Sequence, residues 1–268
     1  MTIWHLLQVN YRHRDLIVDL VHREFRIKYV GSLLGRYWSF LHPIALIAMY
    51  SLVFSKILQL RMGGQQFEHP WAFTLYLCGG LLPWNAFCEM LTRGVATFHD
   101  QANLVKKVNF PKEILVTIAI GSTSLPLVIS LCLYMALMAF TGYGISLWFF
   151  VLPLVFFLQL VFTFGIALTL SVFNVFFRDI QQLVPIVLQL WFWATPLVYT
   201  SDRVPQAYRW ILWLNPYYYF ARLYQEILFF QTAPSMATWL LAGGWALLTV
   251  TTGAIVYYRL SSQLADEL

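Results

Sequence analysis

Charged side chains are scarce in this sequence. Only 11% of its 268 residues are Asp, Glu, Lys or Arg, whereas soluble domains carry about 25%. Hydrophobic residues make up 60% and aromatic residues 18%. This composition indicates an integral membrane protein whose length is taken up by membrane spans. The net charge of +5 lies mostly in the loops, which indicates membrane orientation rather than nucleic-acid binding.

Motifs for nucleotide binding and hydrolysis are also absent. The chain has no G-x-x-x-x-G-K-[ST] loop for ATP phosphates, no H-E-x-x-H and no G-x-S-x-G, so no catalytic residue is predicted. Its three cysteines and six histidines show no metal spacing, so no metal site is predicted. The spans also lack the chained carboxylates and repeated broken helices of secondary transporters, so energy for any pumping must come from elsewhere.

Six hydrophobic blocks are long enough to cross a bilayer as helices. They lie at Tyr37–Leu58, Trp71–Phe98, Ile114–Phe140, Leu147–Phe173, Leu183–Tyr199 and Met236–Tyr258. Six spans place both termini on one side. With that topology, twelve Lys and Arg residues fall on the side of the termini and five on the other, which predicts that both termini are cytoplasmic.

Three regions follow from this layout. Residues 1–34 are expected to form a cytoplasmic N-terminal region, residues 35–258 a six-span membrane domain, and residues 259–268 a cytoplasmic tail. Residues 10–29 predict a basic amphipathic helix, in which Ile17, Val18, Val21, Phe25 and Tyr29 share one face. Such a helix is typical of the membrane interface.

The segment Ser201–Pro234 is irregular. It holds two apolar, aromatic pieces of about a dozen residues each, broken at Asn215-Pro216, and pieces of that length favour re-entrant or interfacial helices over full spans. Non-helical backbone at membrane depth is tolerated only against protein or water. The segment therefore either lines a cavity or its outer mouth, or lies as an aromatic belt at the surface.

Glu89 is the clearest ionisable residue inside a predicted span. Arg93 follows four residues later on the same helix face, so the two are expected to form a structural ion pair. Arg222 and Glu226 have the same spacing in the irregular segment. Proton coupling through Glu89 is the alternative, because an intramembrane carboxylate is often functional.

A strongly polar loop, Asp100–Glu113, separates two of the hydrophobic blocks. Its lysines predict a cytoplasmic position. Leu104, Val105 and Val108 are expected to form one apolar face of a short helix that ends before Pro111. Such a helix is suited to bind another protein. Alternatively, the loop is a solvated connector between two spans.

Several motifs resemble the membrane permease of type-2 ABC exporters for polysaccharide, which move O-antigen, capsule or teichoic acid chains. They are N-L-V-K-K-V-N-F-P-K-E at Asn103–Glu113, F-F-R-D-I at Phe176–Ile180, A-T-P-L-V-Y at Ala194–Tyr199 and L-N-P-Y at Leu214–Tyr217. The resemblance implies an N-terminal interface helix, six spans and two short re-entrant helices before the last span. It also implies a homodimer with two separate ATPase subunits, which hold ATP and magnesium while this chain binds no cofactor.

The same resemblance implies contacts with the ATPase. It places a coupling helix within Asp100–Pro111, and the expected coupling residues are Asn103, Leu104, Val105, Lys106, Lys107, Arg178 and Asp179. It further implies an aromatic-lined channel for a lipid-linked glycan. Independently of the family, aromatic rings offer flat contact to the C–H faces of sugars.

Candidate channel residues come from three places in the chain. They are Tyr37, Trp38 and Tyr50 near the first span, Trp191, Trp193 and Tyr199 near the fifth, and Tyr217, Tyr218 and Tyr219 in the irregular segment. Many of the 48 aromatic residues must instead face lipid or the interface belts.

These features together predict an all-α permease subunit of an ATP-driven exporter of lipid-linked polysaccharide in the bacterial inner (plasma) membrane. A type-2 ABC permease for drugs or small lipids is the nearest alternative. A membrane enzyme acting on polyprenyl-linked sugars is an alternative of another class, and it would need carboxylates gathered at one membrane face, whereas the twelve carboxylates here are scattered.

Overall fold

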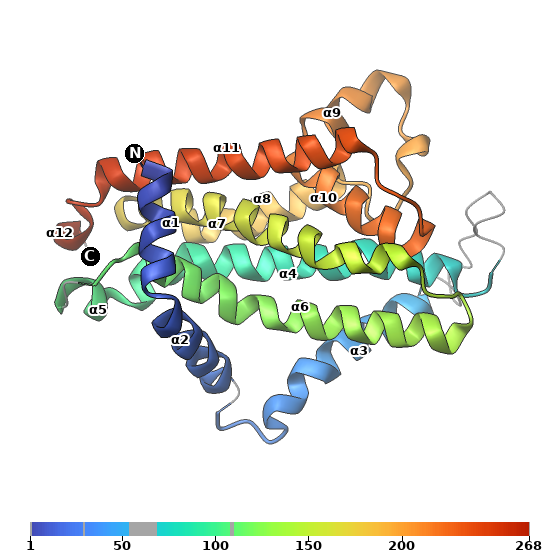
Figure 1. Cartoon of the computed structure of the whole chain (residues 1–268), viewed down its shortest axis with the longest axis horizontal. Coiled ribbons are helices and arrows are strands. Elements are labelled where there is room, and N and C mark those ends of the chain that lie inside the picture. The colour runs from blue at the N-terminus through green and yellow to red at the C-terminus, as the bar shows by residue number, and fades with distance from the viewer. Residues whose placement is uncertain (1, 29, 54–68, 108–109, 268) are drawn as a thin grey trace.

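The computed structural model describes residues 2–28, 30–53, 69–107 and 110–267, and within these residues it is helical without strands. The longest helices are α4 (Ala72–Asp100), α6 (Glu113–Thr141), α7 (Leu152–Phe176) and α11 (Met236–Leu260). They run side by side along the long axis of the molecule (Figure 1). The all-helical fold is therefore confirmed for the described residues.

Helix α4 is the centre of the bundle. It packs on α6 and α7 along its length, and also contacts α8 (Ile180–Ala194) and α10 (Pro216–Gln225). Most of its residues are buried, among them Tyr76, Phe87 and Met90. With 29 residues it is about 43 Å long at 1.5 Å per residue.

Three helical segments of the described chain are long and apolar enough to cross a membrane: Glu113–Thr141, Leu147–Phe176 and Met236–Leu260. Trp38–Val53 and Ile180–Ala194 are shorter apolar helices. These segments and α4 occupy the six blocks predicted as spans, so the predicted helices exist. The end of the first block, up to Leu58, lies outside the described residues. A multi-pass membrane protein follows from this arrangement.

Local signals explain several helix ends. Gly142 has φ +73° at the end of α6, where it closes the last turn in the left-handed conformation. Ser235 starts α11 by accepting a hydrogen bond from the Thr238 amide to its Oγ at 3.2 Å. A short 3-10 turn, Leu147–Val151, leads into α7.

The N-terminal region forms two helices rather than the single interface helix expected over residues 10–29. Helix α1 (Thr2–Arg12) crosses one end of the bundle, and α2 (Arg14–Ile27) continues from it after a break at His13 (Figure 1). The break is explained by tertiary contacts. His5 Nδ1 lies 2.7 Å from the Tyr258 hydroxyl of α11, and the Thr117 hydroxyl of α6 donates to Asn10 Oδ1 at 2.7 Å. Helix α1 is thereby fixed to the bundle, while α2 turns to pack on α6.

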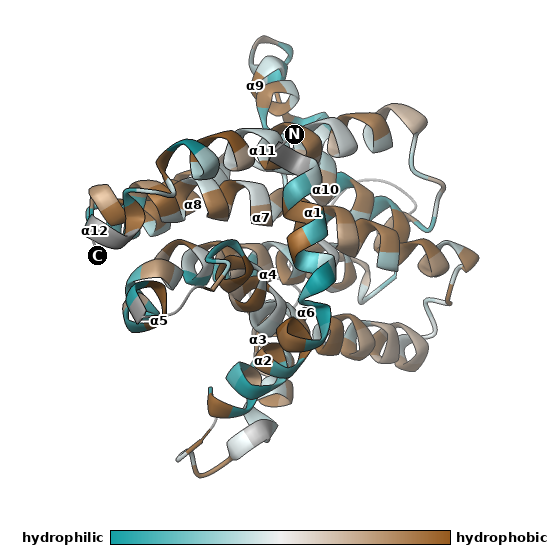
Figure 2. Ribbon diagram, turned by 60° about the vertical axis from the view of Figure 1, so that its left-hand side comes forward, coloured by the Kyte–Doolittle hydropathy of each residue, from teal (hydrophilic) through white to brown (hydrophobic). Residues whose placement is uncertain are grey.

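Helix α2 carries many hydrophilic residues, coloured teal in Figure 2, although Leu16, Val18 and Ile27 are also exposed. Its Val21 side chain sits against Gly121 of α6, where an added Cβ would come within 2.8 Å of it. Both termini lie at the same end of the bundle as α5 (Ala102–Lys107) (Figure 1). We call this the terminus end, and the other the opposite end.

The irregular segment contains the two short helices that were predicted around Asn215-Pro216. Helix α9 (Arg209–Leu214) protrudes from the bundle, whereas α10 lies against α4, α7 and α11 (Figure 1). A π-helical turn, Glu226–Phe230, extends α10. Gln231 then adopts φ +55°, and the chain turns towards α11.

Asn215 holds this segment together. Its Oδ1 accepts hydrogen bonds from the backbone amides of Tyr217 and Tyr218 and from the Trp191 indole, the last at 2.6 Å. Its Nδ2 donates to Ala194 O and to Thr195 Oγ1. Asn215 is therefore both the N-cap of α10, with Pro216 in the first turn, and the connection to the end of α8.

Candidate transport site

Polar residues recur along one face of α4. Asn85, Glu89, Arg93 and Asp100 follow one another at intervals of four, four and seven residues, which places them on one side of a helix. The other sides of α4 are buried in the bundle, whereas these four residues are at least partly exposed. We call them the polar stripe of α4. It is the longest polar surface on the central helix.

A cavity of about 840 Å³ opens over the half of the stripe nearer the terminus end. It lies between α2, α4 and α6, and Gln181 at the start of α8 also contributes to its wall. Its charged lining residues are Glu24, Lys28, Glu89, Arg93 and Asp100. The cavity therefore gathers five charged side chains beside the buried, largely apolar faces of α4 and α6.

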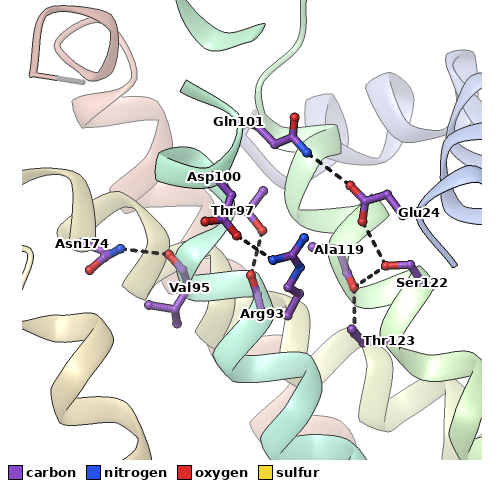
Figure 3. Close-up of polar contacts among 10 residues, drawn as sticks. All are labelled: Glu24, Arg93, Val95, Thr97, Asp100, Gln101, Ala119, Ser122, Thr123 and Asn174. Atoms are coloured by element: carbon purple, nitrogen blue, oxygen red, sulfur yellow. Dashed lines mark hydrogen bonds and ion pairs between the residues drawn. The ribbon is translucent and has the colours of Figure 1, made fainter. Parts of the chain in front are cut away.

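The ion pairs in this cavity differ from the predicted one. Glu89 does not pair with Arg93; its Oε1 binds the Lys28 ammonium from the end of α2. Arg93 instead reaches about two turns along α4 and binds Asp100 Oδ2 at 2.7 Å (Figure 3). The predicted Glu89–Arg93 pair is wrong because α2 brings a competing cation to Glu89, a contact between residues 61 positions apart.

The Lys28–Glu89 pair yields a testable expectation. Both side chains are more than a third exposed, so the pair adds little to folding stability, and its effect is expected on transport. Lys28→Glu and Glu89→Lys should each lower transport severalfold, while the double exchange restores much of it. The measurement is transport at matched amounts of membrane-inserted protein. Equal loss in the single and double variants would contradict a role for the pair.

Glu24 is a site residue that the sequence analysis did not identify. Its carboxylate accepts hydrogen bonds from Gln101 Nε2 at 3.4 Å and from the Ser122 hydroxyl at 3.1 Å (Figure 3). Gln101 is the residue between α4 and α5, and Ser122 belongs to α6. Glu24 thus joins α2 to the base of α5 and to the bundle. No local pattern marks this residue, since its partners are 77 and 98 positions away.

Asn174 is a second connection that sequence reasoning missed. It is fully buried near the end of α7, and its Nδ2 donates to Val95 O of α4 at 3.2 Å (Figure 3). Its Oδ1 accepts the backbone amide of Gln181 at 3.1 Å, and its carbonyl lies 2.9 Å from His99 Nε2. The turn between α7 and α8 is therefore fixed to the terminus end of α4.

The expected coupling residues lie at the terminus end. In α5, Asn103, Leu104 and Lys106 are exposed and Val105 is buried. Within the apolar face expected from Leu104, Val105 and Val108, Val105 turns inward and Leu104 presents its side chain outward. Lys107 ends α5, and Val108 lies outside the described residues. Arg178 and Asp179 are exposed in the turn between α7 and α8.

A smaller cavity of about 350 Å³ continues the polar stripe. It lies between α3 (Trp38–Tyr50), α4 and α6, and Glu89 lines both cavities. Asn85 Nδ2 donates to the Tyr50 hydroxyl at 3.3 Å in its wall. Of the predicted channel residues in the first span, Tyr50 thus faces this polar space, and Tyr37 and Trp38 are exposed near the start of α3.

The other predicted channel residues fall into two groups. Trp193 is 64% exposed at the end of α8, and the partly exposed Tyr199 donates its hydroxyl to Trp193 O at 2.9 Å. Trp191 turns toward Asn215, and Tyr218 and Tyr219 are largely buried. Tyr217 is fully buried, with its ring centroid 4.6 Å from that of Phe87. Tyr217 is therefore a core residue in this structure, because α10 packs into the bundle and its first turn faces α4.

Comparison with known proteins agrees with this architecture. The family model described as ABC-2 type transporter matches residues 16–229. The O-antigen export system permease protein RfbA of Myxococcus xanthus is 33% identical over 233 residues, covering 85% of this chain and 86% of the relative. The protein of the same name from Klebsiella pneumoniae is 29% identical over 203 residues, covering 75% of each chain. The match spans α2 to the π-helical turn after α10, and the chain therefore belongs to the ABC-2 type transporter family.

Proposed function

We propose that this chain is the membrane subunit of an ATP-driven exporter of lipid-linked polysaccharide. The observation that carries the proposal is the similarity, over 85% of the chain, to a protein named O-antigen export system permease. The polar stripe of α4 supports it, because a glycan needs a hydrated, hydrogen-bonding path across an apolar bundle. In this proposal the chain supplies the path, and a separate ATPase subunit holds ATP and magnesium, which agrees with the missing phosphate-binding loop.

The proposal includes the topology and the assembly. Six spans correspond to α3, α4, α6, α7, α8 and α11, and α9 with α10 forms the re-entrant pair. Both termini face the cytoplasm of a bacterial inner membrane, together with α5, whose lysines agree with the positive-inside rule. Two copies of the chain associate with two ATPase subunits. Exposed apolar side chains on α3 and α8, such as Ile44, Ile186 and Leu190, are available for a second copy or for lipid.

Substrate recognition in this proposal rests on shape and hydroxyl groups. Exposed rings at Trp38 and Trp193 offer flat surfaces to sugar faces, and Asn85 and Glu89 offer hydrogen-bonding groups along the path. The stripe carries paired charges rather than a run of one sign, so a moving chain meets no deep electrostatic well.

The function is tested by deleting the gene in its host and complementing it. Deletion should abolish long-chain glycan at the cell surface and leave lipid-linked glycan inside, and complementation should restore export. The purified chain alone should hydrolyse no ATP, whereas its complex with the ATPase should, with a mass of two copies each. Unchanged surface glycan after deletion would refute the proposal, and ATP hydrolysis by the solitary chain would refute the division of labour.

The aromatic path gives a second expectation. Trp193→Leu keeps apolar area but removes the flat ring, so export should fall by about fivefold if the ring contacts sugar, the effect of losing roughly 1 kcal/mol. Trp210→Leu on α9 is the matched control, because Trp210 is also exposed but lies outside α3 and α8. Surface glycan is measured at equal protein levels. A lipid-facing Trp193 would tolerate Leu without loss.

A further inference from the structure

A third cavity lies at the opposite end of the bundle, apart from the polar stripe. Its volume is about 490 Å³, within the range of small-molecule sites. It lies between the start of α4, the connection after α8, α9, and α10 with its π-helical turn. Residues between Pro196 and Thr232, together with Tyr76 from the start of α4, thus enclose one pocket. Figure 1 shows α9 and α10 in the same half of the bundle.

Aromatic side chains form part of the wall. Tyr76, Trp213, Tyr218 and Phe230 line the cavity, and they come from different elements. Trp213 is 67% exposed, so its indole is free to meet a ligand. The position of α9 is fixed, because the Tyr219 hydroxyl donates to Trp213 O at 2.8 Å. A rigidly placed ring beside polar groups suits a sugar, whose faces are apolar and whose edges carry hydroxyls.

The charged groups in the wall balance. Asp202 and Glu226 supply two carboxylates, and Arg209 and Arg222 supply two guanidinium groups. Arg222 Nε binds Glu226 Oε1 at 2.6 Å, as the sequence spacing predicted. The lining therefore has no net charge to attract an acidic or a basic ligand, which favours a neutral one.

One buried acceptor in the wall lacks a donor. Glu226 Oε2 is fully buried and has no hydrogen-bond partner among the described residues. An unpaired buried carboxylate oxygen is costly, but this oxygen has no surface that a ligand could contact, so Glu226 contributes its negative charge to the wall rather than an acceptor. An acidic sugar would bring a second carboxylate towards it and be repelled. A neutral sugar ring fits both the balanced charges and the aromatic wall.

From these observations, and resting on the proposed export function, we propose that this cavity is an outer saccharide site that holds one neutral pyranose residue of the exported glycan. Trp213 provides the ring face, and the Arg222–Glu226 ion pair forms the charged wall beside it. The site lies beyond the polar stripe, so it engages the glycan after passage across the bundle. Each permease subunit thereby binds the emerging glycan between successive transport cycles.

The test uses saturation-transfer NMR on the purified permease–ATPase complex. The probes are methyl glucopyranoside and methyl mannopyranoside as neutral rings, and methyl glucuronide as the acidic one. Wild-type complex should transfer saturation to at least one neutral ring and less to the glucuronide. Trp213→Ala should lower the neutral signal about fivefold or more. Trp210→Ala is the matched control, since Trp210 lies on the same helix but outside the cavity lining, and it should bind as wild type does.

Glu226→Gln provides a gain-of-binding arm. It removes the negative charge opposite Arg222 while keeping the shape, so the preference should shift towards the glucuronide. The site is refuted by absent transfer to both neutral rings in the wild type, by unchanged binding in Trp213→Ala, or by an unshifted preference in well-folded Glu226→Gln. The export proposal fails by a different result, unchanged surface glycan after gene deletion, so the two failures are distinguishable.

Discussion

A single methyl group at Gly165 is expected to separate α7 from α11 and to remove most folded protein from the membrane. A Cβ built at Gly165 would lie 2.2 Å from the Thr249 carbonyl carbon and 2.4 Å from the Val250 nitrogen, both backbone atoms. Backbone atoms of a helix cannot rotate away as a side chain can, so the helices must move apart. Inside a membrane this matters most, because helix association there depends on close packing rather than on the hydrophobic effect.

The same contact is tight from the other helix. A Cβ at Gly253 of α11 would approach Gly165 O to 2.6 Å, and the Thr249 hydroxyl donates across the interface to Phe162 O at 3.2 Å. Gly165→Ala and Gly253→Ala should therefore each destabilise the fold by about 3 kcal/mol or more, the upper part of the range for overpacking. The measurement is the thermal midpoint of the detergent-solubilised chain, with the amount of membrane-inserted protein beside it.

Gly244→Ala is the matched control for this pair. Gly244 lies on α11 as well, and an added Cβ there meets nothing within 4 Å. Alanine is a better helix former than glycine by up to about 1 kcal/mol, so this variant should be neutral or slightly stabilised. If Gly165→Ala behaves like Gly244→Ala, α7 and α11 do not pack as closely as the structure has them.

Much of the fold is predictable from the sequence because its signals are local. Hydrophobic blocks of spanning length correspond to α3, α4, α6, α7, α8 and α11. Asn215-Pro216 predicts a helix boundary, since Asn caps and Pro fits a first turn, and the boundary between α9 and α10 lies there. The Arg222–Glu226 pair also follows from helical spacing alone.

The failures share a cause, which is competition from distant residues. The four-residue spacing of Glu89 and Arg93 is favourable, yet Lys28 binds Glu89 after α2 docks on α6. Tyr217 is predicted from the sequence to line the channel, but the packing of α10 buries it against Phe87. In a chain with 48 aromatic residues, composition does not say which rings face water, lipid or protein. Only the packing of α10 inside the bundle separates Tyr217 from exposed rings such as Trp193.

Two neighbouring residues of α5 differ in their exposure. Both Leu104 and Val105 were expected to contact the ATPase, but Val105 is 4% exposed and Leu104 is 43% exposed. The two neighbours therefore have different roles. Val105 anchors α5 to the bundle, and Leu104 is the apolar side chain available to a partner. Substituting both at once would mix a folding defect with a coupling defect.

Leu104→Asp is expected to abolish export while leaving the chain inserted and folded. In the proposed complex it places a charge in a protein interface where no partner charge is expected, and such a change costs roughly 2–5 kcal/mol, which corresponds to at least a tenfold loss. Export is measured as surface glycan at matched protein level, and ATPase docking as co-purification of the partner subunit. Leu104→Met is the control, because it keeps the apolar contact and nearly the same volume, and it should export normally.

Val105→Asp should fail in a different way. It buries an unpaired carboxylate where a side chain now packs against the core, so the amount of folded chain should fall before any interface is tested. The two variants introduce the same charge at neighbouring positions. Together they compare an outward-facing with an inward-facing residue of α5. If α5 couples the ATPase to the bundle, Leu104→Asp loses export with normal protein levels and Val105→Asp loses the protein. If α5 is only a solvated connector, Leu104→Asp exports as the wild type does, since an exposed Asp in water costs almost nothing. The hydrogen bond from Gln101 to Glu24 of α2 would then transmit no force from an ATPase. The exposed turn at Arg178–Asp179 would be the next candidate contact with the ATPase to test.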